Sequence, residues 1–124
     1  MKIKITFSNY SVEAELNDTP TAKAIYEAAP FEASANTWGD EIYFEVAAQE
    51  TLEEKAKADV EVGELAYWPT MPAFCIFFGP TPMSVSDKPR AASEVNVFGK
   101  LDEVDIKALR NIRGGEKIVV EVAE

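Results

Sequence analysis

The sequence predicts a mainly β fold, in which an antiparallel sheet curls into a barrel and two helices cover or plug it. Short segments that alternate between polar and apolar residues recur along the 124 residues, whereas only two stretches combine helical spacing with capping residues. No internal repeat, linker or change of composition marks a boundary. Residues 1–124 are therefore expected to form a single domain.

The chain begins with a predicted hairpin. Lys2–Phe7 and Tyr10–Leu16 alternate in polarity and flank Ser8-Asn9, a dipeptide suited to a two-residue turn. One register gathers the apolar residues of both strands on one face and places lysines opposite glutamates on the other, as for Lys4 and Glu13. Because both faces agree on one register, the hairpin is well supported.

The first predicted helix follows directly. Thr19 is a suitable N-cap, and Pro20 suits the first helical position. Apolar residues between Ala22 and Ala29 recur on one helical face, and Pro30 ends the helix.

Strands return from Phe31 onward. Asn36–Asp40 is predicted as a loop, and Glu41–Val46 as a strand whose even-numbered residues share one side. Ala47–Ala58 is rich in Glu, Lys and Ala, a composition that fits either a short helix or a solvated excursion.

The most apolar segment lies in the second half of the chain. Val60–Val62 and Leu65–Trp68 are predicted to form a hairpin around Gly63-Glu64. Ala73–Phe78 is apolar at every position, which indicates a strand covered on both faces. Met83–Ala92 has little periodicity and is predicted as a long surface loop, a kind of segment that is often functional.

The chain is expected to close with a strand, a helix and a last strand. Glu94–Leu101 has strand character, and Asp102 begins a predicted helix that Gly114-Gly115 ends. Acidic residues near the start of this helix and basic residues near its end suit the helix dipole. Lys117–Val122 is the last strand, with Val122 among its inward-facing residues.

Charge and composition exclude several classes of partner. The net charge of -10 at pH 7 repels phosphate backbones and anionic lipids, so neither nucleic acid nor a membrane surface is an expected partner. No run of about 18 apolar residues is present to span a bilayer, and the first residues carry no secretory apolar block. A cytoplasmic location is therefore expected.

The chain has no histidine and one cysteine. Without an imidazole, Ser-His-Asp and Cys-His nucleophiles and most catalytic zinc sites are excluded, and no metal or other cofactor is expected. Cys75 has no partner for an internal disulfide and lies in an apolar run. It is interpreted as a small buried residue rather than as a catalytic thiol.

Three stretches resemble the cyclophilins: VNVFGK at Val95–Lys100, the apolar strand Ala73–Phe78, and the first helix at Thr21–Ala29. A closer resemblance is to the prokaryotic TM1367-like group of cyclophilin-like proteins, formerly a domain of unknown function. It is carried by the Asn-Thr-Trp-Gly motif at Asn36–Gly39 and the Tyr-Trp-Pro motif at Tyr67–Pro69. This resemblance covers nearly the whole chain and implies a closed eight-stranded antiparallel β-barrel with two α-helices.

The same resemblance also informs the expected isomerase activity, because two residues of the cyclophilin site are missing from this sequence. In cyclophilins an arginine after a Phe-His pair polarises the prolyl amide of the substrate, and the matching segment here, Phe31–Ser34, contains no arginine. The histidine that precedes the VFG strand in cyclophilins falls at Val95. Because loss of such an electrostatic clamp costs about 2.7–4 kcal/mol of transition-state stabilisation, ordinary prolyl isomerase activity is not expected.

The leading candidates for a binding site are aromatic. Trp38, Tyr67 and Trp68 combine flat apolar faces with polar edges, and Asn36 and Thr37 add hydrogen-bonding groups beside Trp38. Packing at the end of the barrel and a pocket that faces a ligand are both open interpretations for these residues.

Four further residues extend the candidate site. Phe74 and Phe78 are interpreted more readily as barrel core than as groove, and Met83 is a candidate for a flexible rim. Arg90 lies in the predicted loop and is able to fold over the groove, although a solvated loop cation is the favoured interpretation.

Three carboxylates lie near the aromatic motif. Asp40, Glu41 and Glu45 are interpreted first as a solvated face, because their spacing suits neither a shared proton nor a calcium loop. An enzyme of another class that uses Glu41 or Tyr67 as acid or base is kept as an alternative. That alternative requires a strongly shifted carboxylate pKa in the groove.

The leading functional hypothesis is a domain that binds a small molecule or a proline-containing peptide at an aromatic groove at the end of the barrel. The usual isomerase residues are absent from it. A peptidyl-prolyl cis-trans isomerase with a non-standard site and a protein-interaction module are the alternatives, and a homo-oligomer is left open.

Overall fold

The computed structural model describes residues 1–124, which form ten strands and two short helices. The elements, in chain order, are β1 (Lys2–Thr6), β2 (Ser11–Leu16), α1 (Pro20–Ala28), β3 (Phe31–Ser34), β4 (Asn36–Thr37), β5 (Glu41–Glu45), β6 (Lys57–Asp59), β7 (Glu64–Trp68), β8 (Ala73–Phe77), β9 (Arg90–Leu101), α2 (Ile106–Arg110) and β10 (Lys117–Val122). Neither helix is long and apolar enough to cross a membrane.

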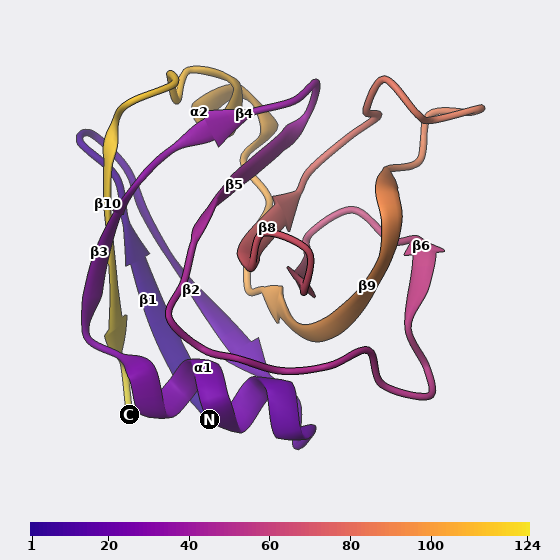
Figure 1. Ribbon diagram of the computed structural model, residues 1–124. Coiled ribbons are helices and arrows are strands. Elements are labelled where there is room, and N and C mark those ends of the chain that lie inside the picture. The colour runs from indigo at the N-terminus through magenta and orange to yellow at the C-terminus, as the bar shows by residue number, and fades with distance from the viewer.

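The strands form one strongly curved antiparallel sheet in the order β3-β10-β1-β2-β9-β7-β8-β5-β4, with β6 paired to β9 beside this path (Figure 1). The expected mainly β, antiparallel architecture with two helices is confirmed. Closure into an eight-stranded barrel is not, because no backbone hydrogen bonds join the two ends of the path. Side chains bridge this gap instead, with the rings of Phe31 on β3 and Phe44 on β5 centred 6.4 Å apart.

The first hairpin has the register that the sequence predicts. Ile3 pairs with Ala14 on the buried face, and Lys4 pairs with Glu13 on the exposed face. At the turn, the amide of Phe7 donates to the carbonyl oxygen of Tyr10 over 2.7 Å. Alternation and turn chemistry are both local, so they determine this register without help from the rest of the fold.

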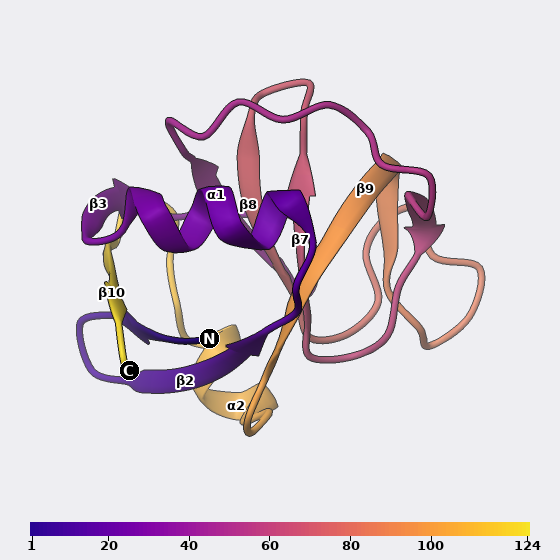
Figure 2. The same ribbon diagram turned by 90° about the horizontal axis from the view of Figure 1, so that it is seen from below.

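Helix α1 begins and ends where its capping residues predict. The hydroxyl of Thr19 accepts a hydrogen bond from the amide of Ala22 over 3.2 Å, Pro20 occupies the first position, and Ala29 is the C-cap. Ala22 and Ile25 are completely buried in the main core. Figure 2 shows α1 lying across one end of the curved sheet, so this helix covers the core at that end.

The segment between β5 and β6 contains no helix, which decides between the two interpretations of Ala47–Ala58. Two buried polar side chains hold it against the sheet. The hydroxyl of Tyr67 donates to the carbonyl oxygen of Ala48 over 2.8 Å and accepts from the amide of Glu50 over 3.1 Å. Asn96 accepts from the amide of Glu53 over 2.8 Å and donates to the carbonyl oxygen of Thr51 over 2.9 Å.

The second predicted hairpin is wrong. Val60–Val62 is not a strand; the preceding residues Lys57–Asp59 form β6 and pair with β9 rather than with β7. Because β6 supplies this partner, β9 begins at Arg90 instead of the predicted Glu94, and the loop before it ends correspondingly earlier.

Helix α2 is shorter than predicted at both ends, because it ends at Arg110 rather than at Gly114-Gly115 and begins later than expected. Helix α2 begins after Asp105, whose carboxylate accepts from the amide of Ala108 over 3.0 Å, and not at Asp102. The side chain of Asp102 is instead bound by Lys2. In β10, Val122 lies opposite Ile3 and so points to the inner side, as predicted, although at the end of the strand it is 43% exposed.

The sheet carries a buried cluster on each face. The larger cluster lies inside the curve and includes Phe44, Phe74 and Phe98, whose rings stack or meet edge to face. The smaller cluster lies on the outer side of β7 and β8 and includes Cys75 and Phe77. Ala73–Phe77 is consequently buried at every position, as its uniform apolar character predicts.

Asn96 is expected to contribute strongly to stability. It is 1% exposed, and its amide group also donates to the hydroxyl of Thr21 over 3.1 Å. Asn96→Ala removes three hydrogen bonds made by a buried side chain and should lower the free energy of unfolding by about 2–3 kcal/mol in urea denaturation. Asn36→Ala, at an exposed position on β4, is the matched control and should lower it by less than about 1 kcal/mol. Equal losses for the two variants would contradict this role of Asn96.

Candidate functional site

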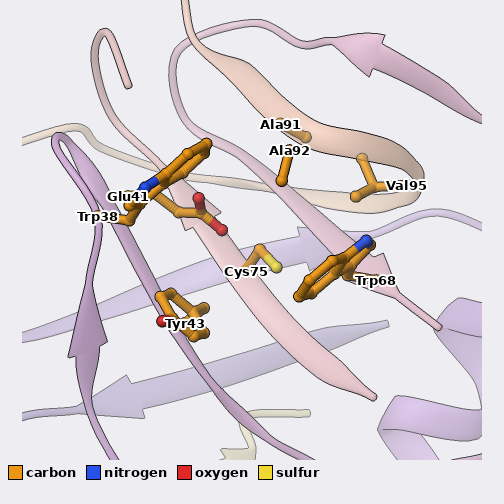
Figure 3. A pocket seen from close by; sticks show the side chains of 8 residues that line it. All are labelled: Trp38, Glu41, Tyr43, Trp68, Cys75, Ala91, Ala92 and Val95. Atoms are coloured by element: carbon orange, nitrogen blue, oxygen red, sulfur yellow. The ribbon is translucent and has the colours of Figure 1, made fainter. Parts of the chain in front are cut away.

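A pocket of about 270 Å³ lies on the outer face of the sheet, the side opposite the main core (Figure 3). Its side chains come from β5, β7, β8, the first half of β9 and the turn before β5. We refer to it as the outer-face pocket. It is lined by Trp38, Glu41, Tyr43, Trp68, Cys75, Ala91, Ala92 and Val95.

Strand alternation explains why Glu41 and Tyr43 line this pocket. In the β5–β8 pair, Glu41 lies opposite Phe77 and Tyr43 lies opposite Cys75. Successive side chains of a strand point to opposite faces. Because Ile42 and Phe44 are in the main core, Glu41 and Tyr43 must point outward.

Small side chains on β9 leave room for the cavity. Ala91, Ala92 and Val95 lie along one side of it in Figure 3. The start of β9 is held over the sheet by pairing between Asp59 of β6 and Arg90. Longer side chains in place of the two alanines would fill the space between β9 and β8.

Two tryptophans stand on opposite sides of the pocket in Figure 3. The amide of Trp38 donates to the carbonyl oxygen of Glu41 over 3.0 Å, across a turn that contains Gly39 with a φ of 61°. A Cβ atom at Gly39 would lie 2.9 Å from the Cα of Thr81, so the turn packs tightly against the neighbouring loop. The indole nitrogen of Trp68 donates to the hydroxyl of Ser93 over 2.7 Å, which fixes the ring edge against β9.

Glu41 is the one charged side chain that lines the pocket, and it is only 6% exposed. The prediction of a solvated face is wrong for this residue. Burial raises the pKa of its carboxyl to about 7, and a hydrogen bond from the Cys75 thiol opposes that rise. No lysine, arginine or N-terminal amine lies within ion-pair distance of it. At neutral pH the pocket therefore holds a carboxyl that can readily gain or lose a proton.

The two neighbouring carboxylates have other environments. Asp40 is bound through both oxygens by Arg110, with Nε–Oδ1 and Nη2–Oδ2 distances of 3.2 and 2.8 Å. Glu45 is exposed at the end of β5. Cys75 is 2% exposed, and burial raises the pKa of its thiol well above the ordinary value. A thiol of this kind is a poor nucleophile at neutral pH, in agreement with its interpretation as a small buried residue.

Only two of the nine predicted site residues, Trp38 and Trp68, line this pocket. Tyr67, Phe74 and Phe78 belong to the main core. The remaining four do not line the pocket. Asn36 and Thr37 are exposed on β4, and Met83 is 47% exposed in the loop after β8. Arg90 forms an ion pair with Asp59 over 3.5 Å. The pocket itself lies on the outside of the sheet, whereas the sequence-based hypothesis placed a groove at the end of a barrel.

The sequence contains a signal that Glu41 and Tyr43, which are not among the nine predicted site residues, share one covered face. The strand Glu41–Val46 was assigned with its even-numbered residues on one side, which already places Glu41 and Tyr43 together on the other side. The uniformly apolar strand at Cys75 indicated that this second side is covered. Val95, where the resemblance places the histidine of cyclophilins, also lines the pocket.

The pocket offers no metal site, since no group of three or more acidic, cysteine or histidine side chains is placed to hold an ion. Arginine and lysine are also absent from its lining. The chemistry available there is apolar and aromatic contact, together with one carboxyl that is ionised or protonated according to pH.

Comparison with known proteins gives a family and several solved structures of similar fold. A family model described as cyclophilin-like matches residues 1–121. The chain resembles the solution structure of the hypothetical protein AF2241 from Archaeoglobus fulgidus, with 42% sequence identity, a TM-score of 0.82, and coverage of 99% of this chain and 95% of that one. It also resembles McbB in complex with tryptophan, with a TM-score of 0.71 over 98% of this chain and 44% of that one; at 14% identity this likeness is one of fold alone. No curated protein matches the chain.

The raised pKa of Glu41 predicts a pH-dependent effect on stability. Its folded-state pKa of about 7 lies above the ordinary value of 4.5, so ionisation destabilises the folded state progressively between these pH values. The full effect above pH 7 is roughly 3 kcal/mol. Glu41→Gln stays neutral and should therefore unfold at a higher Tm than the wild type at pH 8, with the advantage disappearing near pH 4.5.

Glu45→Gln, on the same strand but exposed, is the control for this measurement and should show no such pH dependence. An equal difference in Tm between Glu41→Gln and the wild type at both pH values would show that Glu41 titrates normally.

Proposed function

The chain belongs to the cyclophilin-like family, and we propose that it binds a small, largely apolar molecule in the outer-face pocket. The observation that carries this proposal is a preformed cavity between two tryptophans, lined by apolar side chains and one carboxyl. Small-molecule sites commonly combine such walls with a few polar groups that set orientation. The volume of about 270 Å³ is slightly below the ~300–1,000 Å³ of sites for drug-sized ligands, so the ligand is expected to be smaller than these.

Prolyl isomerisation is less well supported for this pocket. Its mechanism in cyclophilins needs a cation against the prolyl amide, and no arginine or lysine lines the cavity. Arg90, the one loop arginine considered for this role, is engaged with Asp59. A proline-containing peptide would also meet the carboxyl of Glu41 where the cation is required.

Ligand binding can be followed without an added label, because the two tryptophans of the chain both line the pocket. We expect 2-phenylethanol, a neutral aromatic probe, to change their fluorescence in a saturable titration. Ala92→Phe fills the cavity from an exposed position on β9 and should weaken binding about tenfold or more. Ala47→Phe, an equal change at an exposed position outside the pocket, should leave the dissociation constant unchanged. If the two variants bind 2-phenylethanol with equal affinity, the probe binds outside the pocket.

Isomerase activity can be tested directly by NMR exchange spectroscopy. With stoichiometric protein, a proline-containing tetrapeptide is expected to keep its uncatalysed cis-trans exchange time of tens to hundreds of seconds at 25 °C. The reason is the absence of a cation in the pocket. Exchange broadening that disappears in Trp68→Ala would instead assign isomerisation to this site.

A further inference from the structure

We propose that the ligand of the outer-face pocket is a small organic amine, bound as a cation by the carboxylate of Glu41 and the rings of Trp38, Tyr43 and Trp68. This inference rests on the proposed function, since it names the chemical class of the molecule that the pocket takes. Two independent features of the pocket lead to it: a carboxyl without a cation, and three aromatic side chains around the same cavity.

The first feature is the carboxyl of Glu41, which lacks a counterion. Ion pairs elsewhere in the chain engage other carboxylates, and the remaining lining side chains carry no positive charge. Buried charges in proteins are normally paired, because removal from water is unfavourable without a partner. A ligand cation would supply the counterion that the fold does not.

The titratable groups around Glu41 do not replace that cation. The preceding residue, Asp40, is held by Arg110 of α2, and neither residue lines the pocket. From β8, Cys75 contributes a neutral thiol, and from β5, Tyr43 contributes a phenol. On the β9 side the lining is alanine and valine, and on the β7 side it is the Trp68 ring.

The second feature is the arrangement of aromatic rings. Figure 3 shows Trp38 and Trp68 on opposite sides of the cavity, with Tyr43 beneath them and the Glu41 carboxyl directed between the rings. Aromatic faces attract cations within about 6 Å of the ring centre, and tryptophan does so most strongly. Sites that recognise ammonium groups commonly combine several such rings with a carboxylate.

Protonation gives the proposed interaction a definite pH dependence. Without ligand, burial holds the pKa of Glu41 at about 7, so below that pH the carboxyl is neutral and offers no charge to an amine. An alkylamine keeps its proton throughout this range, because ammonium groups of this kind titrate near pH 10. Amine binding should therefore strengthen as the pH rises through 7, and below pH 7 it should release a proton from Glu41.

Three probes of similar shape and different charge test the inference. The affinities of 2-phenylethylamine, 2-phenylethanol and phenylacetate are measured by tryptophan fluorescence at pH 8.5 and pH 5.5. At pH 8.5 the amine should bind about tenfold or more tightly than the alcohol, which corresponds to one charge-assisted contact, and phenylacetate should bind least. At pH 5.5 the preference for the amine should largely disappear.

Variants of two glutamates on β5 test whether Glu41 causes the preference for the amine. Glu41→Gln should abolish the preference for the amine while the alcohol still binds, whereas Glu45→Gln, an exposed carboxylate on the same strand, should retain the preference. Equal binding of amine and alcohol to the wild type at pH 8.5, or a preference that survives Glu41→Gln, would overturn the inference and leave the proposed function standing. The absence of any fluorescence change with all three probes at both pH values would overturn the proposed function itself.

Discussion

The antiparallel register between β5 and β8 is the constraint on which the site depends. Placing Glu41 opposite Phe77 and Tyr43 opposite Cys75 commits these residues to the outer face, because their neighbours Ile42 and Phe44 fill the main core. A shift of one residue would exchange the two faces and bury the carboxyl among phenylalanines. The first half of β9 then covers the outer face with small side chains, and the volume that they leave unfilled is the pocket.

Two adjacent carboxylates, Asp40 and Glu41, have different environments because β5 begins between them. Asp40 lies in the turn, where Arg110 binds it with the geometry of a bidentate ion pair. Glu41 begins the strand and points into an apolar cavity, where the ionised form is disfavoured and its pKa rises. Ionised Glu41 therefore lowers the free energy of unfolding above neutral pH. Carboxyls with a perturbed pKa cluster at binding and catalytic sites, which supports the function that we propose for this pocket.

Local chemistry made much of the fold predictable. The first hairpin follows from its alternation and turn, and α1 follows from Thr19 and Pro20. The elements that were misplaced depend on distant partners: β6 exists because β9 lies beside it, and the segment after β5 is held by Tyr67 and Asn96 from other strands. The tryptophans of the site were found from their residue type. From the sequence, Glu41 is a candidate only as the acid or base of an alternative enzyme, and its burial is not expected, because a charged residue on a strand is usually solvated. That burial depends on how β9 covers the sheet.

The electrostatic character of the pocket differs from the one that the resemblance to cyclophilins implies. In cyclophilins an arginine of the groove polarises the prolyl amide of the substrate. Here Val95 stands where the resemblance places the histidine of that groove, and the charged side chain in the lining is the carboxyl of Glu41. Reversing the sign of the available charge in a low-dielectric cavity reverses the preferred ligand, because the same burial that strengthens attraction to one charge strengthens repulsion of the other. The amine ligand that we propose follows from this reversal of charge.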